Sequence, residues 1–570
     1  MIQTTIHTRS IPQEAYQNLI DAGMDELFAR LFSARGCATL QETQYDMRQL
    51  LHFSQLANIQ AAARTIADAI KKQEKIIIVA DYDADGATAC AVAIRFLRDM
   101  GAMVDFLVPS RFTDGYGITP ILVDKAYQQN ASLLITVDNG INAHAAVKRA
   151  KELNIKIVIT DHHLPGDTLP DCVIVNPNQH ECSFPCKSTA GVGVILYVLI
   201  AVRSLLLQED YFTANRPAPN WAKYLDLVAI GTVADVVRLE HNNRILVQQG
   251  LKRIREGKMQ VGVKALFAVA KCSFQAATTQ DFGFKIAPRI NAAGRLETMD
   301  IGIKCLITDD FDEAMQYAEE LNRLNQERQT IQKNMIEQVN QTLPDLTLSH
   351  HQRTICAYRE DWHEGVIGIV AGKLRERFFR PAIVFAPNEN GEIRGSGRSI
   401  DGLHLRDALD AIAKRYPHIM SRFGGHAMAA GLTLNHAEQI TDFQAAFEEI
   451  VQEMLPQEKW IHQFNTDGSL SKDLITIQTA NLLAQHVWGQ GFAAPSFYDE
   501  FTLENQTLVG KEKNHSKLTL NKDGQSLDAL LFGYTEQFPP RVRAIYQLYV
   551  NHFKNQEYLQ IKIEHWEAIE

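Results

Sequence analysis

IIIVADYDADG, residues 76–86, is the stretch of sequence that decides the fold. It opens with five apolar residues in a row, Ile76–Ala80, which is typical of a strand buried on both faces of a sheet. Its second half carries three aspartates, Asp81, Asp83 and Asp85. The residues that follow, Ala87–Met100, have helical spacing. A buried strand, an acidic turn and a helix in this order predict the first unit of a parallel α/β sheet.

The same alternation of strands and helices continues to residue 176. Further strands are expected at four apolar runs, Val104–Val108, Leu133–Val137, Ile155–Thr160 and Val173–Asn176. Helices are expected between them, at Ile118–Gln129 and Ala143–Leu153. Strands of nearly continuous apolar character, separated by amphipathic helices, predict a parallel sheet that is covered by helices on both faces.

Two later strands of this predicted sheet also end in acidic residues. Asp138-Asn139-Gly140 follows the strand at 133–137, and Asp161-His162-His163 follows the strand at 155–160. Parallel strands carry their carboxyl ends at one edge of the sheet, and ligands bind at that edge. We therefore expect seven side chains to crowd one crevice: Asp81, Asp83, Asp85, Asp138, Asp161, His162 and His163.

So many carboxylates in one place need a positive partner. Two bare carboxylates at 4 Å repel by roughly 4 kcal/mol at an effective dielectric constant of about 20. Divalent cations remove this cost, and carboxylates with imidazole but no thiolate favour Mn²⁺ or Mg²⁺ over structural zinc. The number of acids suits two ions about 3.5–4 Å apart. We expect Asp138 to bridge the two ions, because it is the single acid of its turn and its strand lies in the sequence between the strands that carry the other two acidic turns.

A plainer reading treats each acidic turn separately. An aspartate after a strand is usually the N-cap of the next helix, and Asp85 or Asp161 alone fits that role. A lone histidine pair lies more often at the surface or in a satisfied core than on a metal. This reading weakens when three acidic strand ends share one edge of a sheet.

The rest of the chain divides at changes in pattern. We expect an N-terminal helical segment at 1–70, the acidic parallel-sheet domain at 71–305, a connecting helix at 306–345, a second α/β domain at 346–455 and a β-rich, OB-like domain at 456–570. The connecting helix is predicted from Asp309 or Asp310 to about Thr342, a length of roughly 50 Å that would bridge two domains.

Shorter patterns mark the last two domains. The second α/β domain shows strands at Thr354–Tyr358 and Ala382–Phe385, with a helix at Val366–Arg377 between them. The C-terminal region alternates apolar and polar residues at Lys517–Leu520 and Tyr558–Ile563, which indicates strands of a small barrel.

Composition narrows the class of protein. The chain has 570 residues, of which 46% are hydrophobic, with a net charge of −10. We expect no apolar run of about 18 residues, no signal peptide and a cytoplasmic location. The eight cysteines are read as reduced thiols, because Cys182 and Cys186 with His180 make a poor zinc set. The negative charge argues against a general nucleic-acid binder, although metal-binding carboxylates contribute to it and a channel needs only a local basic stripe.

DYDADG, VDNG and DHH, at the ends of successive strands, resemble the DHH phosphoesterases. A fourth acid fits at Asp235, in GTVADV at 231–236. The likeness continues through PRINAAGR at 288–295, DWHEGVIGIVA at 361–371 and GGHAMAAG at 424–431. These motifs run in order over roughly residues 70–450, and they are most similar to the RecJ exonucleases of this family.

The resemblance implies a role for each matching residue. The metal ligands would be Asp81, Asp83, Asp85, Asp138, His162 and Asp235. His163 would contact the phosphate, and His426 would reach into the cleft from the second domain. Asp161 would orient the histidines by hydrogen bonds, without binding the metal itself. Candidates for binding the DNA backbone are Arg289, Arg295, Arg394, Arg398, Gly424 and Gly425.

The implied activity is 5′-to-3′ hydrolysis of single-stranded DNA to 5′-mononucleotides, in recombination and repair. Metal-activated water would attack phosphorus, while the second metal and His426 would stabilise the growing negative charge. The polarity, and partners such as a single-stranded-DNA-binding protein and a helicase, come from the resemblance alone. Aromatic residues of the last domain could stack bases, although core packing also explains them: Phe492, Phe497, Tyr498, Phe532 and Tyr534.

One segment departs from the family pattern, and three other functions compete with the nuclease. Trp488–Pro495 (WGQGFAAP) replaces a PFGxGNPxP-like entry to the last domain, which leaves the C-terminal DNA surface less defined. The rivals are another DHH hydrolase that acts on short oligoribonucleotides, cyclic dinucleotides or pyrophosphate, a noncatalytic scaffold, and a nucleotide-binding α/β protein. Length, the filled ligand positions and the three acidic strand ends, respectively, argue against them.

Overall fold

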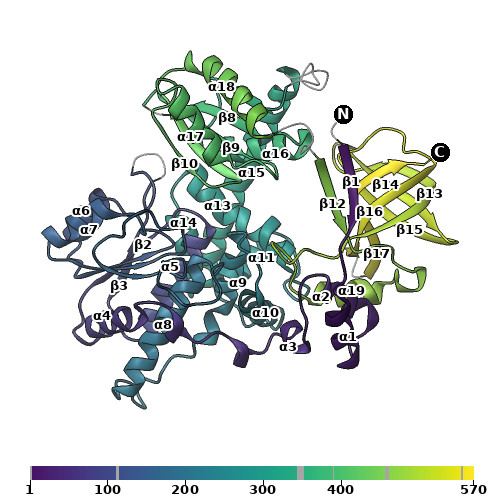
Figure 1. The fold of residues 1–570 in the computed structure, drawn as a ribbon. Coiled ribbons are helices and arrows are strands. Elements are labelled where there is room, and N and C mark those ends of the chain that lie inside the picture. The colour runs from purple at the N-terminus through teal and green to yellow at the C-terminus, as the bar shows by residue number, and fades with distance from the viewer. Residues whose placement is uncertain are drawn as a thin grey trace.

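The computed structural model describes residues 3–110, 114–342, 352–388, 390–455, 461–553 and 556–569. Figure 1 shows two α/β lobes joined by helices, with a strand barrel at one side. The predicted boundary at 345/346 and the predicted start of the last domain at 456 lie outside the described residues.

The first lobe contains the predicted parallel sheet. Its strands are β2 (Ile76–Ala80), β3 (Val104–Leu107), β4 (Leu133–Val137), β5 (Lys156–Thr160) and β6 (Val173–Val175), in the order β3-β2-β4-β5-β6. All neighbouring pairs are parallel, and Ala80, Val137 and Thr160 lie side by side. The residue after each of these three is an aspartate, so the register alone brings the acidic turns to one edge.

Helices cover both faces of this sheet, as the sequence predicts. Alternate residues of β2 enter different cores, because successive side chains of a strand point to opposite faces. Ile78 packs in a core with α4 (Ile59–Lys71), α5 (Ala84–Asp99) and α8 (Gly191–Gln208). Val79 packs in the core that includes α6 (Pro120–Gln128) and α7 (His144–Glu152).

The helix α8 bears on the expectation that the chain has no apolar run long enough to span a membrane. Gly191–Gln208 is 18 residues long with a mean hydropathy of 2.0, so by length and composition it could cross a membrane. It is the one such helix among the described residues, and 67% of it is buried inside the fold. Its position between α4, α5 and α9 (Leu225–Ala234) explains this composition, because a helix surrounded by other elements is apolar all round.

A helical layer connects this sheet to the second lobe. It consists of α9, α10 (His241–Arg255), α11 (Val261–Val269), α13 (Ala287–Leu296) and α14 (Asp300–Ile307). The predicted connecting helix follows as α15 (Phe311–Thr342). Its first half packs on α11, α13 and α14, whereas Met335 and Val339 lie in a core with the second lobe. One helix of about 50 Å thus belongs to both lobes.

The second lobe is the predicted α/β domain. Its sheet has the order β10-β11-β9-β8-β7. The strands are β7 (Ile355–Tyr358), β8 (Ala382–Pro387), β9 (Ile393–Arg398), β10 (Arg422–Gly425) and β11 (Ala429–Leu434). Only the pair β7–β8 is parallel among these described strands. Three helices accompany the sheet: α16 (Ile367–Phe378), α17 (Leu405–Arg415) and α18 (Gln439–Met454).

The C-terminal strands close into a barrel, as predicted. They are β13 (Phe497–Val509), β14 (His515–Lys522), β15 (Gln525–Phe532), β16 (Arg541–Phe553) and β17 (Gln556–Ala568), in the order β13-β14-β15-β17-β16. The helix α19 (Ile477–Gln485) packs against β16 and β17. Closure pairs the outer strands with each other, which protects the sheet from pairing with another chain.

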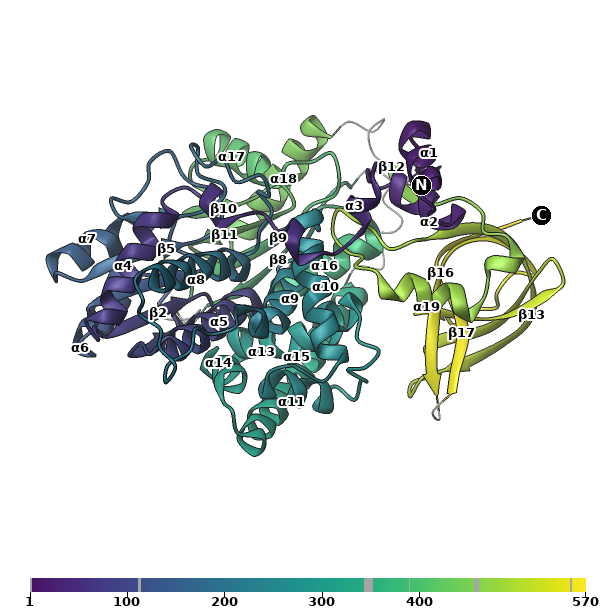
Figure 2. The ribbon, with the colours of Figure 1, turned by 90° about the horizontal axis from the view of Figure 1, so that it is seen from below.

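The N-terminal segment is less helical than the sequence indicates. It contains α1 (Gln13–Asp21), α2 (Glu26–Ser33), α3 (Leu40–Thr43) and nearly all of α4, but it begins with a strand, β1 (Gln3–Thr8). This strand pairs in parallel with β12 (Ile461–Thr466), which leads into the barrel. Figures 1 and 2 both place the N-terminal helices beside the barrel. No local pattern predicts β1, because its partner lies more than 450 residues away.

Candidate metal centre

The acidic edge of the parallel sheet contains three overlapping sets of possible metal ligands. The sets are Asp81 with Asp83 and Asp138, Asp138 with His162 and His163, and Asp85 with His162 and Asp235. Within each set, one ligand atom of each residue lies within 4.8 Å of the others. The first two sets share Asp138 and the last two share His162, so the seven residues of the three sets form one continuous cluster. Every ligand that the sequence predicts lies in it.

Three buried atoms in this cluster show that a positive partner fits. His162 Nε2 lies 3.0 Å from Asp138 Oδ1 and 3.3 Å from Asp235 Oδ2, and none of these atoms has a hydrogen-bond partner among the described residues. Burial and the charge of His163 lower the pKa of His162 to about 4, so its imidazole is neutral. Burial and neighbouring carboxylates raise the pKa of Asp138 and of Asp235 far above the usual range. A divalent cation removes these costs.

Two of the aspartates cap helices, but neither Asp85 nor Asp161 caps the helix that follows its own strand. Asp83 accepts a hydrogen bond from the Gly86 amide, which starts α5 three residues earlier than the sequence indicates. Asp85 accepts bonds from the amides of Gly191 and Val192 at 2.7 and 3.0 Å and thus caps α8 rather than its own helix. Burial, together with Asp83, raises the pKa of Asp85 to about 7.

Glycines let the backbone come close to these carboxylates. A Cβ on Gly191 would lie 2.6 Å from both Cβ and Oδ1 of Asp138. A Cβ on Gly231 would lie 2.9 Å from Asp85 Oδ1 and 2.2 Å from Thr88 Oγ1. Carbon atoms do not approach other atoms so closely without displacement, so α8 and α9 can reach the site only with glycine at these positions.

Asp161 holds the second histidine of the DHH motif. Its Oδ1 lies 2.8 Å from His163 Nδ1 and also accepts the His163 amide. Burial lowers the pKa of His163, but the bond to Asp161 and the surrounding carboxylates outweigh this effect and raise the pKa to about 9. The carboxylate of Asp161 therefore favours the protonated form of His163. Asn178 supports the backbone of His162 by donating to its carbonyl at 2.6 Å.

His426 approaches the same edge from the second lobe. It lies exposed in the turn between β10 and β11, where its amide donates to the Ala429 carbonyl at 2.7 Å. Burial, and then the charge of His163, lower the pKa of His426. Gly425 has φ +141°, and a Cβ there would lie 2.5 Å from the Ala429 oxygen. Gly424 faces open space on the same turn.

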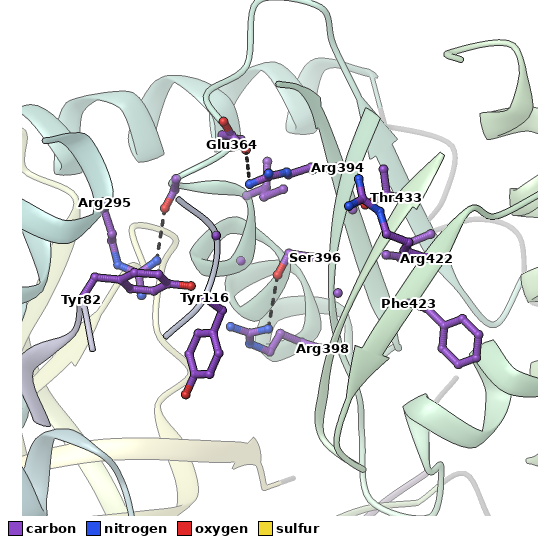
Figure 3. Close-up of a pocket in the computed structure, with 17 residues that line it drawn as sticks. Tyr82, Tyr116, Arg295, Glu364, Arg394, Ser396, Arg398, Arg422, Phe423 and Thr433 are labelled. Carbon is purple, nitrogen blue, oxygen red and sulfur yellow. Dashed lines mark hydrogen bonds and ion pairs between the residues drawn. The ribbon is translucent and has the colours of Figure 1, made fainter. Parts of the chain in front are cut away.

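A cavity of about 580 Å³ lies between the two lobes and adjoins the acidic edge at Tyr82. The first lobe contributes Tyr82 and Tyr116, the helical layer contributes Arg295, and the second lobe contributes Arg394, Ser396, Arg398 and Arg422. Figure 3 shows these arginine and tyrosine side chains around the same space. Four arginines and one acid, Glu364, line the cavity, so it favours an anion.

The arginines of the cavity are held in place by local contacts. Arg295 donates to the Gly365 carbonyl at 3.1 Å, and Arg394 lies 2.9 Å from Glu364. Arg398 donates to the Gly397 carbonyl at 2.8 Å. Gly368 lies in the first turn of α16, where a Cβ would come within 2.8 Å of Ser396 Oγ. Close packing of α16 on β9 therefore brings the positive helix N-terminus to the cavity wall.

Arg289 lies elsewhere. Its guanidinium donates to Asn322 on α15 at 3.0 Å and to the Lys285 carbonyl at 2.6 Å. It is not among the residues that line the cavity. Contact of Arg289 with a phosphate stays a prediction, whereas its contact with α15 is a structural role that the sequence did not indicate.

Three family models match the chain in the order of its domains. The DHH family, N-terminal domain, matches residues 75–232, the DHHA1 domain matches 351–453, and the RecJ OB domain matches 466–565. The chain is 42% identical to the single-stranded-DNA-specific exonuclease RecJ of Escherichia coli (strain K12) over 566 residues, 96% of each protein. It belongs to the RecJ family. The RecJ of Haemophilus influenzae is 40% identical over 556 residues, 95% of this chain and 96% of the relative.

Solved RecJ structures share the fold and contain metal. The crystal structure of RecJ in complex with Mn²⁺ from Thermus thermophilus superposes with a TM-score of 0.82 at 26% identity, covering 100% of this chain and 80% of that one. The crystal structure of exonuclease RecJ bound to manganese has a TM-score of 0.60 at 31% identity, covering 72% and 98%. The T. thermophilus protein is also known in complex with Mg²⁺.

Sequence reasoning missed three residues of this RecJ site. Asn139 donates to the carbonyls of Val79 and Val137, and so ties two strand ends together below the acidic turns. Gly191 admits Asp138, and Tyr116 lies 3.2 Å from His163 Nε2 through its hydroxyl. Only the DNG turn gave a signal for Asn139. The other two act across distances in sequence that no local pattern spans.

Proposed function

We propose that this chain is a metal-dependent exonuclease that hydrolyses phosphodiester bonds of single-stranded DNA from the 5′ end and releases 5′-mononucleotides. The observation that carries the proposal is the cluster of overlapping ligand sets at the edge of the parallel sheet, beside a cavity lined by arginines. The names of its RecJ relatives support the substrate.

The chain offers ligands for two divalent cations, Mn²⁺ or Mg²⁺. The residues that would hold them are Asp81, Asp83, Asp85, Asp138, His162 and Asp235. Asp138 belongs to two of the ligand sets, which supports its role as the shared ligand. When bound, the cations neutralise the carboxylates and lower the pKa of a coordinated water toward neutrality, which supplies the nucleophile.

Other residues would act on the phosphate. His163, held by Asp161, is placed to stabilise the negative charge that builds up on a phosphate oxygen. His426 would add a second contact from the other lobe. Water adds to phosphorus, the bond from phosphorus to the sugar 3′ oxygen breaks, and the 3′ oxygen leaves with a proton from solvent.

The cavity lined by four arginines, called the arginine cavity below, would hold the 5′ end of the DNA strand. A terminal 5′ phosphate held by Arg295, Arg394 and Arg398 would leave the next phosphodiester bond near the acidic edge, because Tyr82 borders both. This arrangement gives one nucleotide per cut and supports the 5′-to-3′ polarity. The space between the two lobes would admit a single strand and exclude a duplex.

We also propose a division of labour among the five segments. Residues 71–305 would hold the metals, 346–455 would hold phosphate, and 456–570 would bind single-stranded DNA, with 1–70 and 306–345 as supports. Phe532, 52% exposed on the barrel, could stack a base, whereas Phe492 and Phe497 are buried and serve the core. The wider setting would be recombination and repair in the cytoplasm, with a single-stranded-DNA-binding protein and a helicase as partners.

A labelled oligonucleotide tests the proposal. Single-stranded DNA labelled at either end is incubated with Mn²⁺, Mg²⁺ or EDTA, using wild type and Asp138→Ala, with blunt duplex as control. We expect metal-dependent release of the 5′ label as mononucleotide by wild type alone, and no cleavage of the duplex. If wild type cleaves DNA with neither metal, a noncatalytic scaffold becomes the favoured function. Cleavage confined to dinucleotides would favour a hydrolase of short substrates.

A further inference from the structure

Tyr116 connects the acidic edge with the arginine cavity. Its hydroxyl lies 3.2 Å from His163 Nε2, and its ring packs edge-on against His163 at 6.0 Å and against Tyr82 at 5.9 Å between ring centroids. The same ring lines the cavity, together with Arg398 (Figure 3). Tyr116 is 52% exposed, so packing alone does not explain a large ring at this place.

His163 is held at both ring nitrogens. Nδ1 contacts Asp161 at 2.8 Å, and Nε2 contacts the Tyr116 hydroxyl at 3.2 Å. An imidazole with one such partner can still pivot about that bond, whereas two partners on opposite sides fix the plane of the ring. Tyr116 therefore decides in which direction His163 presents its Nε2.

The strand ends of the sheet place Tyr116. Asn139, which ties β2 to β4, accepts a hydrogen bond from the Ile118 amide at 3.0 Å. Gly117 has φ +65°, which favours glycine, and a Cβ there would make a tight contact of 3.2 Å with the Asn139 side chain. The loop that carries Tyr116 is thus anchored to the same two strands that present Asp81 and Asp138.

We propose that Tyr116 is a positioning residue with two separable parts. Its hydroxyl fixes the plane of the His163 ring, so that the imidazole stays beside the scissile phosphate, and its ring forms the wall between the acidic edge and the arginine cavity. The inference rests on the proposed nuclease function. It assigns the hydroxyl to turnover and the ring to binding of a terminal nucleotide that carries a 5′ phosphate.

Two substitutions separate the parts. Tyr116→Phe removes only the hydroxyl, and Tyr116→Ala removes the ring as well. The matched control is Tyr127→Phe, because Tyr127 is 54% exposed on α6 and is not among the residues that line the cavity. The full-length protein is assayed with Mn²⁺ on single-stranded DNA with and without a 5′ phosphate, and Mn²⁺ affinity is measured by calorimetry.

We expect Tyr116→Phe to lower kcat about threefold to tenfold, the effect of one hydrogen bond, with KM within about twofold of wild type. We expect Tyr116→Ala to raise KM for 5′-phosphorylated DNA by about tenfold in addition, with less change for DNA that lacks the phosphate. Mn²⁺ affinity and Tyr127→Phe should match wild type.

Each alternative outcome is distinct. If wild type does not cleave, the proposed function fails. If wild type cleaves and Tyr116→Phe has the same kcat, the role of the hydroxyl is wrong. Equal KM for Tyr116→Ala and wild type would remove the role of the ring. Weaker Mn²⁺ binding by Tyr116→Phe would show that the residue supports the metal ligands instead.

Discussion

Single atoms decide how the acidic edge is assembled, and Gly191 is the clearest case. Its missing side chain allows α8 to reach Asp138 and lets its amide bind Asp85. We expect Gly191→Ala to weaken Mn²⁺ binding and to reduce nuclease activity more than about tenfold, because a Cβ 2.6 Å from Asp138 displaces that carboxylate. The control is Gly372→Ala in α16, where no atom lies within 4 Å of an added Cβ. Equal activity of the two variants would show that Asp138 can move without consequence.

A second residue, Asp226, predicts a pH dependence of stability. It is fully buried at the start of α9, with one carboxylate oxygen accepting the Gln260 amide at 2.5 Å and the other unpartnered among the described residues. Burial raises its pKa to about 6 from 3.8 in the unfolded chain. A raised carboxyl pKa means that the folded state binds the proton more tightly, so the contribution of Asp226 to stability is greatest below pH 4 and is lost as pH rises to about 6.

Replacing Asp226 removes this titration. We expect the Tm of Asp226→Asn to rise relative to the Tm of wild type between pH 4 and 6.5. The exposed Asp401→Asn serves as control. The shift corresponds to roughly 3 kcal/mol of linkage at most, at 1.36 kcal/mol per pKa unit. Parallel Tm curves for wild type and Asp226→Asn, measured by differential scanning fluorimetry, would show that Asp226 stays charged.

At the scale of elements, α15 sets the relation between the two lobes. All proposed metal ligands precede it, whereas His426, Arg394 and Arg398 follow it in the chain. Gln329 lies exposed near the middle of this helix. A proline there removes one backbone hydrogen bond and clashes with the preceding turn, at a cost of about 3 kcal/mol, and bends the helix.

We expect Gln329→Pro to retain Mn²⁺ binding and to lose activity, because the proposed metal ligands stay together while the second lobe moves. Gln329→Ala is the control, since it keeps the helix straight. The measurements are Mn²⁺ affinity by calorimetry and kcat/KM on single-stranded DNA. Full activity of the proline variant would mean that the lobes are positioned by contacts other than α15.

At the scale of the whole molecule, the N-terminal segment fastens the barrel to the nuclease lobes. Asp467, just after β12, accepts hydrogen bonds from Arg35 at 2.8 and 2.9 Å and from Arg9 at 3.3 Å. The Asp467 and Arg35 side chains are 1% and 3% exposed. Phe32 of α2 stacks on Trp488 at 5.8 Å, in the segment that departs from the family pattern. The N-terminal segment therefore holds the barrel in place through these contacts.

Breaking this buried ion pair should loosen the barrel. Removing one partner of a buried pair costs about 3–5 kcal/mol, because the other charge stays behind without a partner. We expect Asp467→Asn to keep the wild-type kcat/KM on a trinucleotide but to lose affinity for long single-stranded DNA. We also expect a larger radius of gyration in small-angle scattering. The exposed Asp473→Asn serves as control. Unchanged affinity for long DNA would separate the barrel from binding of the strand.

The sequence by itself determined the parts of this RecJ chain that depend on local pattern. The continuous apolar strands predict the parallel sheet. Because parallel strands have their carboxyl ends at the same edge of the sheet, the aspartates that follow three of these strands, Asp81, Asp138 and Asp161, lie at that edge. The long helix and the barrel strands were visible for the same reason, since their periodicity is written in consecutive residues.

Only the tertiary structure decided contacts between distant segments. It showed that Asp85 caps α8, that Gly191 must lack a side chain, that Tyr116 contacts His163, and that β1 pairs with β12. Each of these depends on a distance between residues far apart in the chain. Such a distance is set by the packing of the whole core, and no local pattern of apolar and polar residues encodes it.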